Sequence, residues 1–367
     1  WYNRNREIID KYNPDLFWFD FSLDKTNTTA QFLSYYYNYA QENNKDGVVV
    51  NYKWNLEPET AVYDIERGQT SDILEIPWQT DTTISRRSWG YIENDDFKRP
   101  VDLLGLLLDT VSKNGNLLLN VGPDKEGRIP EAARKTFALM GEWLRMNGEG
   151  IYSSRPWDIY GEGPTKVGGG IGSDDLSYTV EDFRFTTNKQ RDTLYLYGMK
   201  WPQNTKHISV NSLRTGAVDL SGLKGIRLEG SNEQITYSQG ADGLDVTLPD
   251  VNPNGNGSDL PYLIVLEFDN EVPEYINLRD GFLRIEAESA DNSSGRPQTG
   301  SGLEHFSQFA SLGWFNDPQT DWAVFKNVDF SSKMPTTVTA VAGTEAEATV
   351  KIHLDSKDGP VIATIPL

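Results

Sequence analysis

The first stretch of the chain alternates helical and extended patterns. Ile8, Ile9 and Tyr12 are spaced at helical intervals, and the apolar run Leu16 to Phe19 follows them. A short apolar run after an amphipathic segment is typical of a parallel strand that is covered on both faces. The run stops at Asp20, so this segment predicts a buried strand with a carboxylate at its carboxyl end.

The same alternation continues to about residue 150. Apolar periodicity predicts helices over 30–42, 101–113 and 130–146, and strands over 47–52 and 115–121. A long segment up to about residue 96 is rich in turn formers and aromatic residues, with one short extended piece at 73–78. Strands that alternate with helices indicate parallel βα units. Because a closed eight-stranded barrel takes roughly 250 residues, we expect residues 1–150 to form the C-terminal portion of a (β/α)8-like barrel.

Helical periodicity disappears from residue 151. Alternating runs at 194–197, 226–228 and 262–266 are separated by Gly, Asn and Asp turns, which is typical of antiparallel sheets. We predict a β-sandwich over 151–272. A second, partial β-sandwich of the jelly-roll type is expected over 278–367, so the predicted fold class is multidomain α/β plus β.

Composition narrows the choice of partners. Lys and Arg number 34 against 54 Asp and Glu, a formal charge of −20, which argues against nucleic acid or an anionic membrane surface. The absence of cysteine excludes disulfides and thiolate metal sites. No run approaches the roughly 20 apolar residues of a membrane span. The first residues lack a secretory signal and an initial Met, so we expect a piece of a longer product.

Asp20 has two interpretations from its position alone. In α/β barrels, catalytic residues lie where strands end and loops begin. An Asp after a strand also commonly caps the next helix or turn. Position alone favours neither.

With these patterns in place, the first 270 residues resemble glycoside hydrolase family 29, the retaining α-L-fucosidases. Five motifs carry the resemblance in the family's order. They are Tyr-Asn-Pro-Asp-Leu-Phe-Trp-Phe-Asp at 12–20, Pro-Trp-Gln-Thr-Asp-Thr at 77–82, Ser-Trp-Gly-Tyr at 88–91, Asn-Leu-Leu-Leu-Asn-Val-Gly-Pro at 116–123, and Gly-Glu-Trp-Leu with Asn-Gly-Glu-Gly-Ile-Tyr within 141–152. The family's upstream strands, which carry sugar-binding His residues, have no counterpart here.

The resemblance implies a two-step displacement between two carboxyl groups roughly 5 to 5.5 Å apart. Asp20 corresponds to the nucleophile, which must be ionised, and we expect nearby donors to keep its pKa low. Trp18 corresponds to an aromatic residue that packs under fucose, with a core Trp as the alternative. Lys53 lies where some relatives have Arg, and we predict that it binds substrate and steadies the Asp20 charge.

The proton donor is harder to assign, because the family places it on a variable loop. Some members carry Glu where this chain has Gln79, and an amide cannot deliver a proton. The remaining candidates are Glu57, Glu59, Glu66 and Glu75. We predict Glu66 as the acid/base from its spacing to Asp20, with Glu75 as second choice and a surface ion pair as the alternative role.

Three further residues near the motifs are candidates. Trp78 and Trp89 are predicted to line the substrate pocket, with burial in the core as the alternative. Asn120 ends the Leu-rich strand, and we expect it to tie loops together through its amide.

The last block, residues 282–367, resembles family 6 of the carbohydrate-binding modules. The resemblance implies a structural Ca²⁺ with Glu286 and Glu288 as ligands, which suits the preference of calcium for oxygen. Ordinary alternation along a solvated strand is the other interpretation of these two residues. Trp314 and Phe315 lie in the region of the family's stacking aromatic residue.

Together these features predict a secreted or periplasmic, exo-acting α-L-fucosidase that acts on fucosylated oligosaccharides or glycoconjugates. The chemistry needs no cofactor. Two alternatives stay open: a carbohydrate-binding protein without turnover, and an α-L-galactosidase, whose substrate differs by one hydroxyl.

Overall fold

The computed structural model describes residues 1–20, 23, 26–53, 56, 60–167, 170–275, 292–293, 323–324, 349–353 and 360–366. The chain divides into two compact units, Trp1–Ile276 and Asn277–Leu367. Within the second unit, the described strands form two antiparallel pairs, β16 (Asn292–Ser293) with β17 (Ala323–Val324) and β18 (Thr349–His353) with β19 (Val361–Pro366).

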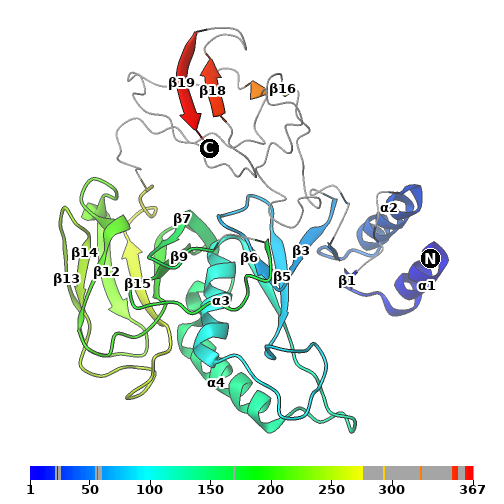
Figure 1. The fold of residues 1–367 in the computed structure, drawn as a ribbon, viewed down its shortest axis with the longest axis horizontal. Coiled ribbons are helices and arrows are strands. Elements are labelled where there is room, and N and C mark those ends of the chain that lie inside the picture. Colours follow the sequence, from blue (N-terminus) through cyan, green and yellow to red (C-terminus); the bar gives the residue numbers. More distant parts are fainter. Residues whose placement is uncertain are drawn as a thin grey trace. The chain divides into compact units, whose positions relative to one another are not determined.

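The first half of unit one is a parallel α/β sheet (Figure 1). Its strands follow the order β1-β2-β3-β5-β6, and every neighbouring pair is parallel. This arrangement confirms the predicted α/β class and the portion of a barrel. The elements are α1 (Tyr2–Tyr12), β1 (Leu16–Trp18), α2 (Asn27–Glu42), β2 (Val49–Tyr52), β3 (Val62–Glu66), β5 (Trp78–Thr83), α3 (Pro100–Ser112), β6 (Gly115–Asn120) and α4 (Glu131–Asn147).

Two strands differ from the prediction. The expected extended piece at 73–78 is irregular, and β5 begins only at Trp78. Strand β3 lies inside the segment that was predicted to be a long loop. The reason is that β3 carries Asp64 and Glu66 on its inner face, where acidic residues weaken the local strand signal.

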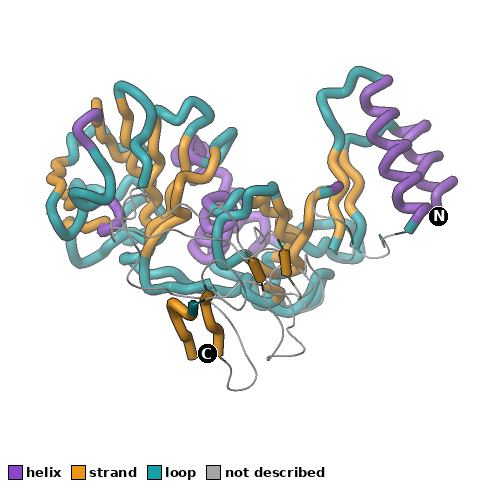
Figure 2. Tube along the Cα trace, turned by 90° about the horizontal axis from the view of Figure 1, so that it is seen from above, coloured by secondary structure: helices purple, strands orange, loops and turns teal. Residues whose placement is uncertain are grey.

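Helix α2 packs against one face of the sheet at β1 and leaves the other face open there. Phe17 packs edge-to-face on Phe32 and Tyr36 of α2, with ring centroids 5.3 and 5.0 Å apart. Since side chains alternate along a strand, Leu16 and Trp18 point to the opposite face, where both are exposed. Figure 2 shows α1 and α2 side by side beside these strands. The open face is the one that lines the interior of a barrel.

The second half of unit one is antiparallel. A five-stranded sheet has the order β12-β15-β10-β9-β7, and a three-stranded sheet has the order β11-β14-β13. Their bounds are β7 (Arg155–Glu162), β9 (Phe183–Thr187), β10 (Thr193–Gly198), β11 (His207–Val210), β12 (Leu223–Leu228), β13 (Thr236–Gln239), β14 (Leu244–Thr247) and β15 (Tyr262–Phe268), with 3-10 turns η2 (Gly148–Gly150), η3 (Asn211–Leu213) and η4 (Leu220–Gly222).

The central strand β10 is buried on both faces. Leu194 and Leu196 belong to the core shared with the three-stranded sheet, whereas Tyr195 and Tyr197 belong to the core that contains side chains of α3 and α4. Helix α3 also contacts β6, β7 and β9. Helices α3 and α4 therefore lie between the parallel and antiparallel sheets, as Figure 1 shows.

Two features tie the halves of unit one together. One is a buried triad in which Asp109 of α3 accepts from Lys113 at 2.7 Å and from Arg184 of β9 at 2.6 Å. The other is the short antiparallel pair of β4 (Gly68–Gln69) with β8 (Gly170–Ile171). A Cβ atom on Gly68 would lie 2.4 Å from the Gly170 carbonyl oxygen, so this contact requires glycine at position 68.

Candidate active site

The carboxyl edge of the parallel sheet gathers charged side chains. Asp64 of β3 lies beside Gln79 of β5, and Glu66 lies beside Asp81 one layer further along. Neighbouring residues of parallel strands share a face, so these four side chains occupy the inner face of the sheet. Asp20 follows β1 and comes to the same edge.

Lys53, which follows β2, is the centre of this cluster. Its side chain is only 1% exposed. The Nζ atom lies 2.7 Å from Asp81 Oδ1, 3.6 Å from Glu66 Oε2 and 3.9 Å from Asp20 Oδ1. One buried ammonium is therefore shared by three carboxylates that come from or follow three different strands, β1, β3 and β5.

The shared ammonium limits the distance between the two predicted catalytic acids. The Asp20 and Glu66 oxygens can be no farther apart than the sum of their distances to Nζ. This limit includes the roughly 5 to 5.5 Å separation that a retaining glycosidase needs. The side chains of Asp20 and Glu66 are 48% and 30% exposed, so solvent and ligands can reach both.

Trp18 forms one wall of the site. Its Nε1 donates to Asp64 Oδ2, which also accepts from Gln79 Nε2 at 2.6 Å. The Lys53 ammonium lies 5.4 Å from the centre of the Trp18 ring. These contacts orient the indole, while more than a third of it stays exposed on the open face. Gln79, which occupies the position where some family members carry an acid, therefore serves here as a hydrogen-bond donor to Asp64.

Two of the acids around Lys53, Asp20 and Asp81, bind protons more tightly than free side chains do. Burial raises the pKa of Asp20, the carboxylates of Glu66 and Asp81 add to the rise, and Lys53 opposes it. The expectation of a low pKa for Asp20 is therefore wrong, because repulsion and burial outweigh one shared cation. Burial, with Asp64 next to it, raises the pKa of Asp81 to about 6 despite the hydrogen bond from Lys53.

Two predicted candidates lie away from this cluster. Trp78 is fully buried at the amino end of β5, where Nε1 donates to the Lys113 carbonyl at 2.8 Å. It has no surface with which to contact substrate, so the prediction that it lines the pocket is corrected to a core role. Glu75 precedes Trp78 and is likewise at the amino end of β5, whereas Asp20 and Glu66 lie at carboxyl ends.

Trp89 lies near the edge that carries Glu66. It is 37% exposed, and the Arg67 guanidinium lies 5.9 Å from its ring centre. Asn120 of β6 donates to the Trp89 carbonyl at 2.8 Å and to Thr83 Oγ1 at 3.1 Å. Asn120 therefore ties the end of β5 to the loop that carries Trp89, through its amide as expected from the sequence.

Asp64 and Asp81 are the site residues that sequence reasoning missed. A signal for them exists in the segments Asp-Ile-Glu at 64–66 and Gln-Thr-Asp at 79–81. Both alternate polar and less polar residues with a period of two, which is the pattern of strands with one polar face. Two such strands side by side bring all their polar residues to one surface.

Other candidates lie outside the described residues: Glu57, Glu59, Glu286, Glu288, Trp314 and Phe315. Within the described ranges, no group of three or more His, Asp or Glu side chains is arranged to hold a metal ion. In the same part of the chain, no helix has the length and apolarity needed to cross a membrane.

Known families match both ends of the chain. Residues 1–149 match the family model for alpha-L-fucosidase, and residues 286–367 match that for carbohydrate binding module family 6. The tissue alpha-L-fucosidase of Bos taurus is 34% identical over 166 residues, which are 42% of this chain and 35% of that protein. The human tissue enzyme is 27% identical over 271 residues, 71% of this chain and 53% of the relative.

Solved structures show the same fold. An alpha-L-fucosidase structure matches with a TM-score of 0.57 and 23% identity, covering 72% of this chain and 55% of that one. The Thermotoga maritima alpha-fucosidase gives a TM-score of 0.55 at 23% identity with the same coverage. The chain spans about half the length of most of these relatives.

A parallel α/β sheet with paired carboxylates at its carboxyl edge is the arrangement of barrel glycoside hydrolases. The matched regions correspond to an α-L-fucosidase domain of glycoside hydrolase family 29 over residues 1–149 and to a family 6 carbohydrate-binding module over residues 286–367. The resemblance found in the sequence motifs is confirmed at the level of family.

Proposed function

We propose that the protein is an exo-acting α-L-fucosidase that removes terminal α-linked L-fucose from glycans with retention of configuration. The observation that carries the proposal is the convergence of Asp20 and Glu66 on Lys53 Nζ at the carboxyl edge of the parallel sheet. In this proposal the fucosylated oligosaccharide or glycoconjugate lies outside the cytoplasm, and the protein is secreted or periplasmic.

The two acids divide the reaction between them. In the first step an Asp20 oxygen bonds to the anomeric carbon while the glycosidic C–O bond breaks and Glu66 gives its proton to the leaving oxygen. In the second step Glu66 takes a proton from water, the water oxygen bonds to the anomeric carbon, and Asp20 leaves as a carboxylate.

Lys53 has a supporting role in this scheme. Its ammonium stabilises the Asp20 carboxylate before attack and again when the covalent intermediate breaks down. Because an ammonium is a point charge, it can move between Asp20, Glu66 and Asp81 as their charges change. Trp18 offers an exposed apolar ring on which the sugar's C–H face can pack.

The nucleophile is tested by Asp20→Asn in the full-length protein. Hydrolysis of an aryl α-L-fucoside is expected to fall by at least about a thousandfold, because no covalent intermediate can form. Wild-type protein purified in parallel is the reference, and turnover retained by the variant would remove Asp20 from the mechanism.

The proton donor is tested by chemical rescue. Glu66→Ala should lose activity, and azide should restore turnover of an activated aryl fucoside with a fucosyl azide as product, because azide attacks the intermediate without base assistance. Glu75→Ala is the matched control and should behave as wild type. No rescue in Glu66→Ala would transfer the role to another carboxylate.

A second candidate function is sugar binding without turnover. It is favoured by Gln79, an amide where some family members carry an acid, which here is committed to a hydrogen bond with Asp64. Binding on a glycan array without release of fucose would support this candidate.

The choice of sugar is tested separately. A parallel assay with an aryl α-L-galactoside decides between an α-L-fucosidase and an α-L-galactosidase.

A further inference from the structure

A segment of the antiparallel half reaches back to the strand end that carries Glu66. Strands β7 and β9 are neighbours in their sheet, and part of the connection between them, residues 170–175, lies against the parallel sheet. Besides the β4–β8 pair, Ser173 accepts from the Gln69 amide through Oγ and from Gln69 Nε2 through its carbonyl, each at 2.9 Å.

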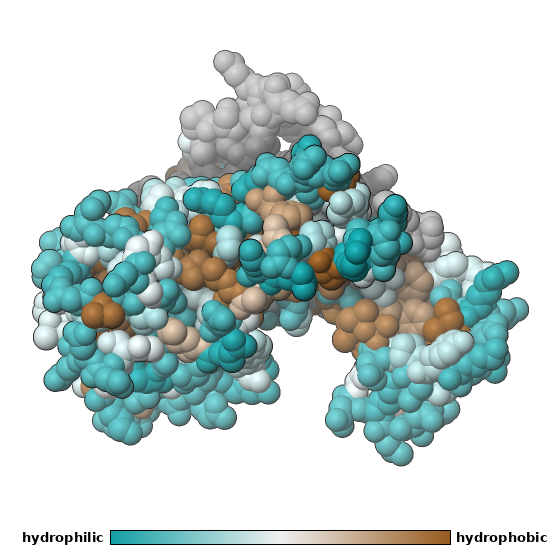
Figure 3. Space-filling view, turned by 90° about the horizontal axis from the view of Figure 1, so that it is seen from below, coloured by the Kyte–Doolittle hydropathy of each residue, from teal (hydrophilic) through white to brown (hydrophobic). Residues whose placement is uncertain are grey.

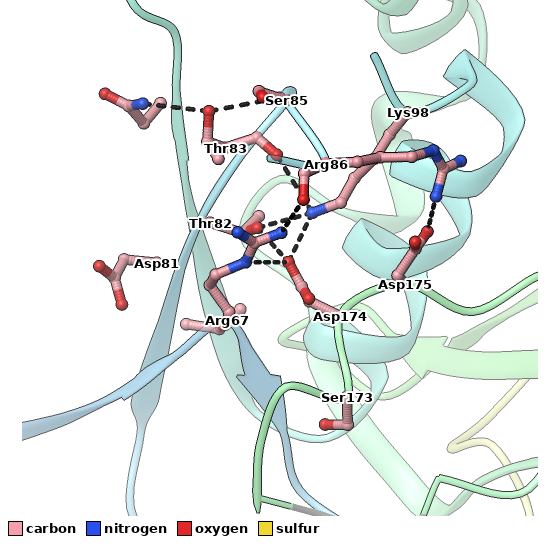
Figure 4. A network of polar contacts seen from close by, with 12 residues as sticks. Arg67, Asp81, Thr82, Thr83, Ser85, Arg86, Lys98, Ser173, Asp174 and Asp175 are labelled. Carbon is pink, nitrogen blue, oxygen red and sulfur yellow. Dashed lines mark hydrogen bonds and ion pairs between the residues drawn. The ribbon is translucent and has the colours of Figure 1, made fainter. Parts of the chain in front are cut away.

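Asp174 is the charged centre of this contact. Its side chain is 3% exposed, and it pairs with Lys98, accepts from Thr82 Oγ1 and lies 3.4 Å from Arg67 Nε. Figure 4 shows Arg67, Lys98 and Thr82 converging on Asp174, with Asp81 pointing away from this network. The network therefore lies behind the face of β5 that carries the site.

Arg67 is the residue through which this network reaches Glu66. It follows Glu66 directly and has a left-handed backbone with φ 47°, which a non-glycine residue adopts only at a cost. Its amide donates to the Asp81 carbonyl at 2.7 Å, and its carbonyl accepts from the Gly172 amide at 2.8 Å. Asp174 holds the guanidinium, so main chain and side chain are both fixed.

We propose that Asp174 is a positioning residue for Glu66: by holding Arg67 at the end of β3, it fixes the direction from which the proton donor approaches the glycosidic oxygen. The proposal rests on the proposed function. Misplacement of a catalytic group by about 1 Å can cost about a hundredfold in rate, so a fixed strand end matters for acid catalysis.

The test uses the dependence of kcat/KM on the leaving group in the full-length protein. Aryl α-L-fucosides with poor leaving groups need a proton from Glu66, whereas dinitrophenyl fucoside needs little help. In Asp174→Asn we expect about a tenfold or greater loss on the poor leaving groups and less than about a twofold loss on the activated one. Loss of folded protein alone would lower kcat/KM for all substrates by the same factor.

Asp175→Asn is the matched control. Asp175 is the next residue of the same segment, pairs with Arg86 instead, and its side chain is 46% exposed. This variant should keep the wild-type leaving-group dependence. Arg67→Gln is the second variant, because its partly exposed side chain can be changed without stranding a buried charge; it should reproduce the steeper dependence even if Asp174→Asn fails to fold.

Three outcomes overturn the proposal. An equal loss on every substrate would mean that Asp174 only stabilises the fold, and an unchanged dependence in folded Asp174→Asn or Arg67→Gln would mean that it does not position the donor. If Glu66→Gln itself shows no steeper dependence, the donor assignment in the proposed function is wrong, and this inference is lost with it.

Discussion

At the scale of single residues, the site is organised by charge balance around Lys53. Three carboxylates lie within 3.9 Å of its ammonium, and two of them are partly exposed while Asp81 is 7% exposed. A buried charge without a partner is far more costly than an exposed one. The buried pair Lys53 and Asp81 therefore matters for stability, and the exposed pair Asp20 and Glu66 is available for chemistry.

Lys53→Met should destabilise the protein by about 3 to 5 kcal/mol at pH 7.5, because Asp81 is left buried without its cation. The raised pKa of Asp81 means that its protonated form is favoured by folding, so its stabilising contribution is present at low pH and lost as pH rises through about 6. The loss in Lys53→Met should therefore be smaller at pH 5. Urea unfolding at both pH values measures this, with Lys11→Met, an exposed pair with Glu7, as the control that should change stability by less than about 1 kcal/mol. An equal loss at both pH values would contradict the prediction.

Asp81→Asn should move the pH profile of kcat/KM to lower pH. Removing this carboxylate takes away a negative charge that raises the pKa of Asp20 and leaves Lys53 free to favour the ionised acids. The midpoint of the acidic limb, where Asp20 loses its proton, is expected to move to lower pH by up to about one unit. Asp95→Asn, which changes a carboxylate that contacts Ser85 and Arg87, serves as the control. A profile that stays in place or moves upward would refute this electrostatic account.

Some of this site was predictable from residue patterns and some was not. Asp20 could be found because a carboxylate interrupts an apolar run. Asp81 could not, because a buried charge is tolerated only when a partner such as Lys53 lies on another strand, and no local pattern shows that contact. Trp78 was misplaced for a related reason: the same motif spans both ends of β5, and the sequence does not show which end faces the site.

At the scale of elements, the parallel sheet depends on close packing between β5 and β6. A Cβ atom at Gly115 would lie 2.5 Å from Trp78 Cε2 and 2.7 Å from Thr110 Cγ2. Trp78 has no room to move, because it is fully buried and held by its hydrogen bond to Lys113. This contact fixes the position of the first residue of β6 relative to the end of α3.

Gly115→Ala should cost about 1 to 3 kcal/mol of unfolding free energy, since overpacking forces Trp78 or the strand to shift. Guanidinium unfolding followed by Trp fluorescence measures the loss. Gly222→Ala is the control, because a Cβ there meets no atom within 4 Å and should be close to neutral. A neutral result for Gly115→Ala would mean that the contact is looser than the structure indicates.

Helices and long apolar strands of the parallel half were predictable, and β3 was not. Amphipathic periodicity identified α2, α3 and α4 to within a few residues. Strand β3 carries Asp64 and Glu66 because its inner face lines the site, so function overrides the local strand propensity. The element that the sequence hides is thus the one that carries the proposed proton donor.

At the scale of the whole first unit, a buried ion triad joins α3 to the antiparallel sheet. Burial alone would raise the pKa of Asp109, but Lys113 and Arg184 hold it below its usual range. The depressed pKa gives stability that is present above the ordinary Asp pKa and is lost only in strong acid. Both halves share this triad, so we expect them to unfold together.

Asp109→Ala should lower stability by about 3 to 5 kcal/mol, because two buried cations lose their common partner. In the wild type, the signals of the α/β and antiparallel parts should fall in one transition, measured by far-ultraviolet circular dichroism and by Trp fluorescence. Glu131→Ala, which removes an exposed pair with Arg134, should change stability by less than about 1 kcal/mol. Two separated transitions in the wild type would contradict the coupling.

Strand β1 has one further consequence for the molecule in solution. Among the described strands it ends the order of the parallel sheet, with β2 on one side. Its inner face shows Leu16 and the neighbouring Val49, and Figure 3 shows apolar patches among a mainly hydrophilic surface. A strand at the edge of a sheet presents backbone amides and carbonyls that can pair with a strand of another chain. Where the edge of β1 is not covered, low protein concentration and the repulsion between like net charges are what prevent two copies of the chain from pairing through it.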